Sequence, residues 1–172
     1  MHQHLKNDRY LRAARARIFD AVRPLSTDQY NKPFPIGPGS LRAILHHCIL
    51  SEWYYTARLE QRDLPPYKDW PIKDESPFTF PELEHTWASQ ADRTTAALNA
   101  VQDWNAALSY TVHNNDGHTI SVTCTKSDLA TQRLLHETYH RAQIVNILKG
   151  LGINTPDLDY NALMYTRSDK PA

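Results

Sequence analysis

"LLHETYHRAQI", Leu134 to Ile144, is the stretch from which the fold can be worked out, because it sets two histidines four residues apart. On a helix, residues at this spacing lie one turn apart on the same face, so His136 and His140 point in the same direction. Leu129 and Ile144 continue that face, which indicates that both imidazoles face the interior of a helical domain. An imidazole buried without partners is costly, whereas a neutral imidazole nitrogen is a common ligand of transition metals. The stretch therefore predicts a helix that holds a metal ion; two histidines hydrogen-bonded to neighbouring helices are the plain alternative.

Around this stretch, four segments repeat apolar residues with the period of a helix. They cover residues 5–23, 41–60, 80–104 and 126–150. Ser40 and Thr79 are the expected N-caps of the second and third helices, Thr125 or Ser127 caps the fourth, and Gly150 ends it. Two long proline-rich connections, "KPFPIGPGS" (32–40) and "DLPPYKDWPIKDESPFTF" (63–80), separate the first three helices. Connections of this length indicate that not all neighbouring helices are joined by tight turns.

A strand-like pattern follows the third helix. The stretch "LSYTVHNNDGHTISVTC" (108–124) alternates around Asn115-Asp116-Gly117, a strong short-range signal for a β-hairpin. The tail "NTPDLDYNALMY" (154–165) predicts a short extra turn or helix. Together these patterns predict one all-α domain over residues 1–172, a four-helix bundle with long crossover connections and a small β-hairpin before helix four.

Composition and charge exclude several classes of protein. The 172 residues have a formal net charge of zero, so nothing steers the chain toward nucleic acid or an anionic membrane surface. No apolar run approaches the ~20 residues of a membrane span, and the N-terminus lacks the apolar core of a signal peptide. We therefore expect a cytoplasmic protein that binds neither nucleic acid nor membranes. Cys48 and Cys124 are the only cysteines and are expected to be free thiols, with Cys48 in the core.

A third histidine on the second helix completes a candidate metal site. His47 follows Ile44 by three residues and lies on or beside the face that Ile44, Cys48 and Tyr55 direct to the core. Its neighbour His46 points about 100° away, so the two cannot share one inward direction. Three imidazoles from two helices leave coordination positions open, a pattern typical of a catalytic site and not of a closed structural site.

The same stretch also contains HExxH, the signature of zinc metalloproteases. A protease of the thermolysin type needs a downstream glutamate, but no glutamate follows Glu137. One of the metzincin type needs a glycine and a third histidine soon afterwards, and "HRAQIVNILKG" has no further histidine. Asp157 or Asp159 could serve as a third metal ligand only if the chain after Pro156 turned back to the two histidines. Glu137 is rotated by about 100° from His136 and need not face the metal. A metallopeptidase is therefore the weakest interpretation.

The two candidate metal helices resemble the signature helices of the DinB/YfiT-like metalloprotein superfamily. The resemblance lies in "LHHCILSEWYY" (45–55) and "LLHETYHRAQIVNILKGLG" (134–152). In that family a histidine, followed five residues later by an acidic residue, joins a His-x3-His-Arg-x-Gln motif. The matching residues here are His47, Glu52, His136, His140, Arg141 and Gln143. Tyr139 and Ala142 depart from the family pattern, which often has a histidine and a glycine there, but neither is a ligand position.

The resemblance implies a four-helix bundle that binds a divalent transition metal (zinc, nickel or iron) through His47, His136 and His140, and frequently a homodimer. Family members with known activity include thiol transferases and a thiol-dependent isomerase. We therefore expect a metal-dependent transferase that uses a low-molecular-weight thiol, or water, on a small electrophilic substrate. Glu52 either orients a ligand histidine or pairs with an arginine such as Arg141; no catalytic residue is assigned. A small-ligand-binding or stress-response sensor module without catalysis is the alternative.

Overall fold

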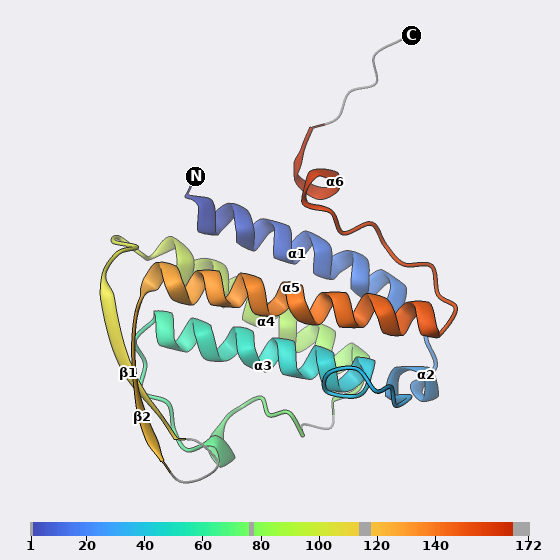
Figure 1. The fold of residues 1–172 in the computed structure, drawn as a ribbon, viewed down its shortest axis with the longest axis horizontal. Coiled ribbons are helices and arrows are strands. Elements are labelled where there is room, and N and C mark those ends of the chain that lie inside the picture. The colour runs from blue at the N-terminus through green and yellow to red at the C-terminus, as the bar shows by residue number, and fades with distance from the viewer. Residues whose placement is uncertain (1, 76–77, 114–117, 167–172) are drawn as a thin grey trace.

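Four long helices form the framework of the computed structural model, which describes residues 2–75, 78–113 and 118–166 (Figure 1). These are α1 (Gln3–Val22), α3 (Leu41–Leu59), α4 (Phe80–Asn99) and α5 (Lys126–Gly150). The shorter elements are α2 (Thr27–Asn31), the 3-10 turn η1 (Tyr67–Asp69), strands β1 (Ala107–His113) and β2 (Thr119–Thr125), and α6 (Tyr160–Met164). The described part of the chain is therefore mostly helical, with one small antiparallel hairpin.

The four long helices share one core. Helix α3 packs against α4 and α5, and α1 packs against the same two helices. Figure 1 shows that α1 and α5 run in one direction while α3 and α4 run in the other. Because α3 and α4 are parallel neighbours, the chain must return along the whole of α3, about 28 Å at 1.5 Å per residue. This return explains the long proline-rich connection between them.

The core is built from the apolar stripe of each helix. Helix α3 contributes Ile44, Leu45 and Ile49, which are at most 2% exposed, and Trp87 of α4 and Ile147 of α5 meet them in the same cluster. Each large apolar side chain buried in this way contributes roughly 1.5–3 kcal/mol relative to exposure. Cys48 belongs to this cluster, and burial raises the pKa of its thiol, so its predicted place in the core is confirmed.

Side-chain caps fix where the helices begin. The Ser40 hydroxyl accepts a hydrogen bond from the backbone N–H of Ala43, and Thr79 forms a capping box with Glu82. Of the two caps predicted for α5, the structure selects Thr125, which forms a capping box with Asp128. Each such cap contributes about 1 kcal/mol. The predicted starts of α3, α4 and α5 are thereby confirmed.

The hairpin is joined directly to α5. Strands β1 and β2 pair antiparallel from Ala107 opposite Thr125 to His113 opposite Thr119. The predicted turn at Asn115-Asp116-Gly117 lies outside the described residues. Because the last residue of β2 is also the N-cap of α5, the strand sets the position at which the histidine-bearing helix begins.

One predicted boundary differs from the structure, and one short helix was not predicted. Helix α4 ends at Asn99 and not near Trp104, because the Trp104 ring stacks on His2 at 4.7 Å between ring centroids, and its carbonyl accepts from the Ser127 N–H. These tertiary contacts draw the chain off the helical path. Helix α2 was not predicted, although Ser26 and Gln29 form a capping box that signals it. In the part of the chain that the structure describes, no helix has the length and apolar character to cross a membrane.

Candidate metal centre

Three histidine side chains converge where α3 lies against α5. The Nε2 atoms of His47 and His136 are 3.1 Å apart. The ring centroid of His140 lies 4.8 Å from that of His47 and 4.4 Å from that of His136. One ligand atom from each residue can be chosen so that all lie within 4.8 Å of one another. The three histidines predicted from the sequence are thus brought together, two from one helix face and one from its neighbour.

The cluster lies at the edge of the helix pair and not in its centre. The side chain of His47 is 31% exposed, His136 is half-buried and His140 is buried. His46, in contrast, is fully buried against Phe78, with 5.4 Å between ring centroids, so it is His46 and not His47 that faces the core. Burial lowers the pKa of His46 to about 4. The expectation that both histidines of α5 point into the interior therefore holds fully only for His140.

Hydrogen bonds to the far side of two rings orient the nitrogens that face the cluster. His47 Nδ1 lies 3.0 Å from a carboxylate oxygen of Asp74, and His140 Nδ1 lies 2.8 Å from the side-chain oxygen of Gln143. Both oxygens are acceptors, so each Nδ1 carries the proton and each Nε2 keeps its lone pair. Partners of this kind are the usual support of metal-binding histidines. Ser51 Oγ lies 3.4 Å from His136 Nε2.

Gly37 lies close to the side chain of Gln143. Gly37 has a positive φ of 51°, and a Cβ atom built there would collide with the side-chain amide of Gln143. The connection before α3 thus approaches α5 closely at the residue that supports His140. Glycine permits both the backbone conformation and the approach.

Two histidines of the cluster, His136 and His140, have lowered pKa values. Burial, followed by the neighbouring His140 and His47, lowers the pKa of His136 to about 4. Burial also lowers the pKa of His140. Neutral imidazole is the form that binds a metal. Nitrogens that share one zinc ion at about 2.0–2.1 Å lie roughly 3.3 Å apart in a tetrahedral site, close to the separation seen between His47 and His136. The donor set therefore fits zinc, nickel or iron, with part of the coordination sphere open to solvent.

Glu52 and Arg141 do not support the histidines. Glu52 is 1% exposed and accepts hydrogen bonds from Arg15 at 2.5 Å and from the indole of Trp87 at 2.7 Å. Arg141 donates to the Thr138 hydroxyl at 2.8 Å and lies over the ring of Tyr10. Of the two roles predicted for Glu52, pairing with an arginine is the one observed, but the partners are Arg15 and Arg133. The hydrogen-bond partners of His47 and His140 are instead Asp74 and Gln143.

Glu137, the middle residue of HExxH, lies away from the cluster. It is 7% exposed, and burial raises the pKa of its carboxyl group, which Arg15, Arg133 and Arg141 oppose. A metalloprotease needs this glutamate beside the metal as a general base. Its position among buried arginines agrees with the prediction that it plays no such role.

Asp74 could not have been found from the sequence. It lies in the proline-rich connection, 27 residues after His47, and no periodic pattern links the two. Gln143 was part of the recognised motif, but its task was not assigned. Tyr139, a departure from the family pattern, is 64% exposed and its ring lies 5.2 Å from that of His140. Ala142 is exposed and does not alter the core.

A mostly helical chain with three histidines gathered from two packed helices defines a class: helical proteins with a histidine cluster able to hold a metal ion. The model of the DinB family matches residues 1–170, so the chain belongs to the DinB family. This confirms the resemblance drawn from the two histidine-bearing segments. Among curated proteins, none matched the chain.

Proposed function

We propose that the protein is a metal-dependent transferase of the thiol S-transferase type, in which His47, His136 and His140 bind one divalent transition metal. The observation that carries the proposal is the cluster itself: three imidazoles, two of them oriented by Asp74 and Gln143, at a half-open edge of the helix pair. Family membership supports it. In the same proposal, the four long helices form the four-helix bundle that the family resemblance implies.

The residues of the chain have distinct tasks in this function. A zinc, nickel or iron ion would supply Lewis acidity and lower the pKa of a thiol or water in an open coordination position. Asp74 holds the proton of His47 on Nδ1, and Gln143 does the same for His140, so that both Nε2 lone pairs stay available. Tyr55, whose ring lies 6.2 Å from that of His136, shields one side of the cluster. The exposed edge of His47 leaves access for a small electrophile.

Turnover with a panel of thiols tests this function. The metal-loaded protein would be incubated with cysteine, glutathione and other biological thiols together with monochlorobimane, a generic electrophile whose thioether products fluoresce. We expect metal-dependent turnover that differs between thiols and disappears in His136→Ala. The matched control is His85→Ala, which removes an exposed histidine of α4.

Other outcomes would replace the proposal. Tight binding of a thiol without turnover would favour the sensor module, and digestion of casein would favour the metallopeptidase. The homodimer implied by the family resemblance stays a prediction, which sedimentation velocity would test.

A further inference from the structure

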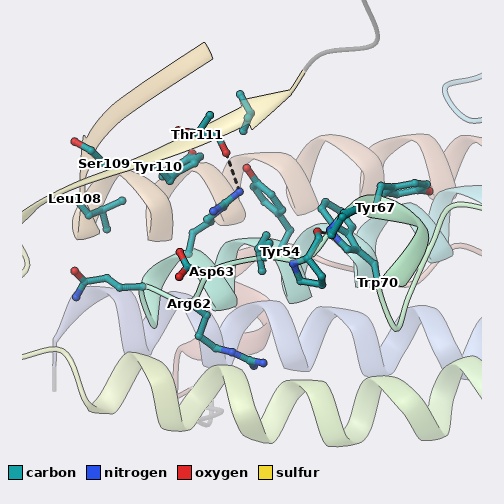
Figure 2. Close-up of a pocket in the computed structure, with 15 residues that line it drawn as sticks. Tyr54, Arg62, Asp63, Tyr67, Trp70, Leu108, Ser109, Tyr110 and Thr111 are labelled. Atoms are coloured by element: carbon teal, nitrogen blue, oxygen red, sulfur yellow. Dashed lines mark hydrogen bonds between the residues drawn. The ribbon is translucent and has the colours of Figure 1, made fainter. Parts of the chain in front are cut away.

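A cavity separate from the histidine cluster lies beside the last turns of α3, next to the hairpin. Its volume is about 730 Å³, and it is lined by the last turns of α3, the segment 61–70 and strand β1 (Figure 2). Ligand pockets in proteins commonly measure roughly 300–1,000 Å³. Its wall combines four aromatic residues, Tyr54, Tyr67, Trp70 and Tyr110, with polar residues such as Asp63 and Ser109. A cavity of this size and mixed lining suits a small molecule that has both a flat or apolar body and a polar group.

One guanidinium group is fixed within this aromatic wall. The Arg58 guanidinium carbon lies 4.5 Å from the ring centroid of Tyr110 and 5.0 Å from that of Tyr54. Its Nη2 donates to the Thr111 carbonyl at 3.2 Å, the bond drawn as a dashed line in Figure 2. Its Nε is buried without a hydrogen-bond partner. Stacking on two rings holds the planar fork in one orientation, which lowers the entropy lost when it binds an anion.

Arg58 has no carboxylate partner in the part of the chain that the structure describes, unlike Arg12, Arg15, Arg23, Arg62, Arg93 and Arg133, which all form ion pairs. Among the described residues, no carboxylate oxygen lies within 4.0 Å of its guanidinium nitrogens. Asp63 also lines the cavity, yet no ion pair joins it to Arg58. Arg62, which lines the same cavity, has its Nη1 3.7 Å from a Glu60 carboxylate oxygen. A half-buried guanidinium with free donor capacity is the group that recognises carboxylates in a two-pronged geometry.

The cavity and the histidine cluster lie on the same side of α3. His47, Ser51, Tyr54 and Arg58 follow one another at spacings of three or four residues, so they form one face of the helix. His47 and Arg58 are separated by about 16 Å along the helix axis. The ring of Tyr55 lies between the two sites, 5.4 Å from Tyr54 and 6.2 Å from His136.

The connection between α3 and α4 reaches both the cavity and the histidine cluster. Asp74 binds His47 through its carboxylate, while its backbone N–H donates to the Tyr67 hydroxyl at 3.1 Å. Tyr67 in turn lines the cavity and contacts Trp70, with 5.0 Å between ring centroids. The segment that orients a candidate metal ligand therefore also forms part of the cavity wall.

We propose that this cavity binds a small molecule that carries a carboxylate on an aromatic or otherwise apolar body, with Arg58 as the anion contact. Tyr54 and Tyr110 position the guanidinium, and Trp70 packs against the body of the ligand. The cavity is also the anchoring subsite for the molecule on which the metal centre acts; this second part rests on the proposed function.

Matched probes test the binding site on the full chain as purified. Phenylacetate and naphthoate would be titrated against the neutral amides phenylacetamide and naphthamide, with binding followed through the NMR signals of the Trp70 indole N–H and the Arg58 Nε–H. We expect both signals to shift and each carboxylate to bind about tenfold more tightly than its amide. Equal affinity of acid and amide, or no shift of either signal with either carboxylate, would overturn the proposal.

Two substitutions within the cavity separate recognition by Arg58 from general attraction to positive charge. Arg58→Gln is expected to remove the preference for the carboxylate, and Arg58→Lys, which keeps the charge but not the fork, to restore part of it. Arg17→Gln, the matched control, removes an exposed arginine of α1 that does not line the cavity and is expected to leave the preference within about twofold, since exposed charges contribute little. Far-ultraviolet circular dichroism verifies that each variant is folded. An equal loss in Arg17→Gln would contradict the role given to Arg58.

Failure of this inference can be told apart from failure of the proposed function. A variant with His47, His136 and His140 all changed to alanine should lose turnover but keep the carboxylate preference, since none of the three lines the cavity. With a carboxylate-bearing electrophile, Arg58→Gln should raise KM about tenfold with kcat preserved. Carboxylate binding in a protein without any turnover would contradict the metal-dependent function alone; turnover insensitive to Arg58→Gln would contradict the anchoring subsite alone.

Discussion

At the scale of single residues, the chemistry of the cluster depends on which ring nitrogen carries the proton. His47 and His140 each have an oxygen acceptor at Nδ1, from Asp74 and Gln143, so their Nε2 atoms are left as ligands. These two acceptors come from different parts of the chain, one in the connection between α3 and α4 and the other three residues after His140. The site is therefore assembled by the fold and not by the helix pair alone.

Removing the carboxylate behind His47 should weaken metal binding without abolishing it. We expect Asp74→Ala to lower metal affinity by roughly 10- to 100-fold, because such supporting partners set ring orientation and ligand basicity. Competition with a chromophoric chelator measures the affinity. The control is Asp69→Ala, an exposed aspartate of the same connection in η1. An unchanged affinity in Asp74→Ala would show that the bond to His47 has no part in the site.

Gly37 should matter to the metal site although it touches no histidine. In Gly37→Ala, the new Cβ displaces the side chain of Gln143 and removes the acceptor from His140. We expect weaker metal binding, measured by the same competition, and a loss of about 1–2 kcal/mol in stability from the left-handed backbone. Gly152→Ala is the matched control, since Gly152 has φ of 73° with no atom near its Cβ position. It should lose stability alone; an equal loss of metal affinity there would refute the route through Gln143.

At the scale of helices, α1, α3 and α5 are joined by charges buried between them. Arg15 of α1 pairs with Glu52 of α3 at 2.5 Å, and Arg133 of α5 pairs with Asp8 of α1 at 2.5 Å and with Glu52 at 3.4 Å. The side chains in these pairs are at most 7% exposed. Buried charges hold a fold together only when each has its partner. Glu52 stands at the centre of this network and not beside the histidine cluster.

Glu52→Ala therefore tests the role of this residue. The substitution leaves Arg15 and Arg133 without a shared partner and should lower the free energy of unfolding by about 3–5 kcal/mol, measured by urea denaturation. The matched control, Asp92→Ala, breaks the exposed pair with Arg12 and should cost no more than about 1 kcal/mol. The metal content of folded Glu52→Ala should equal that of the wild type. A loss of metal with little change in stability would restore Glu52 as a support of the ligands.

Some helix boundaries and site residues could be predicted from the sequence and others could not, for physical reasons. The starts of α3, α4 and α5 follow from local capping residues such as Ser40 and Thr125, whose hydrogen bonds are made within one turn. The end of α4 could not be predicted, because it depends on Trp104 stacking against the N-terminal histidines. The three clustered histidines were predicted from helical spacing. Asp74 was missed, because only the folded path of the connection brings it to His47.

At the scale of the whole molecule, the metal would cross-link the helices α3 and α5 at the edge of their contact. A ligand that binds only the folded state stabilises it, by about 2.7 kcal/mol when its free concentration is one hundred times its Kd. The long connection between α3 and α4 is bound to the same site through Asp74. Metal binding should therefore be visible in the stability of the entire fold.

Thermal unfolding with and without metal measures how much metal binding stabilises the fold. We expect a higher Tm for the metal-loaded protein than after exhaustive chelation, because the ion binds the assembled site and not the unfolded chain. The difference should vanish in His47→Ala, which breaks the connection between the two helices, and persist in His85→Ala. A metal-dependent gain in Tm of equal size in His47→Ala would point to binding elsewhere on the chain.

Elemental analysis of the purified chain tests the central claim most directly. After loading and removal of free metal, we expect about one zinc, nickel or iron ion per chain in the wild type and in His85→Ala, as for a three-histidine site. The variant with His47, His136 and His140 all replaced by alanine should carry none. A wild-type chain without metal, or a triple variant that retains as much metal as the wild type, would contradict the assignment of these histidines as a metal centre.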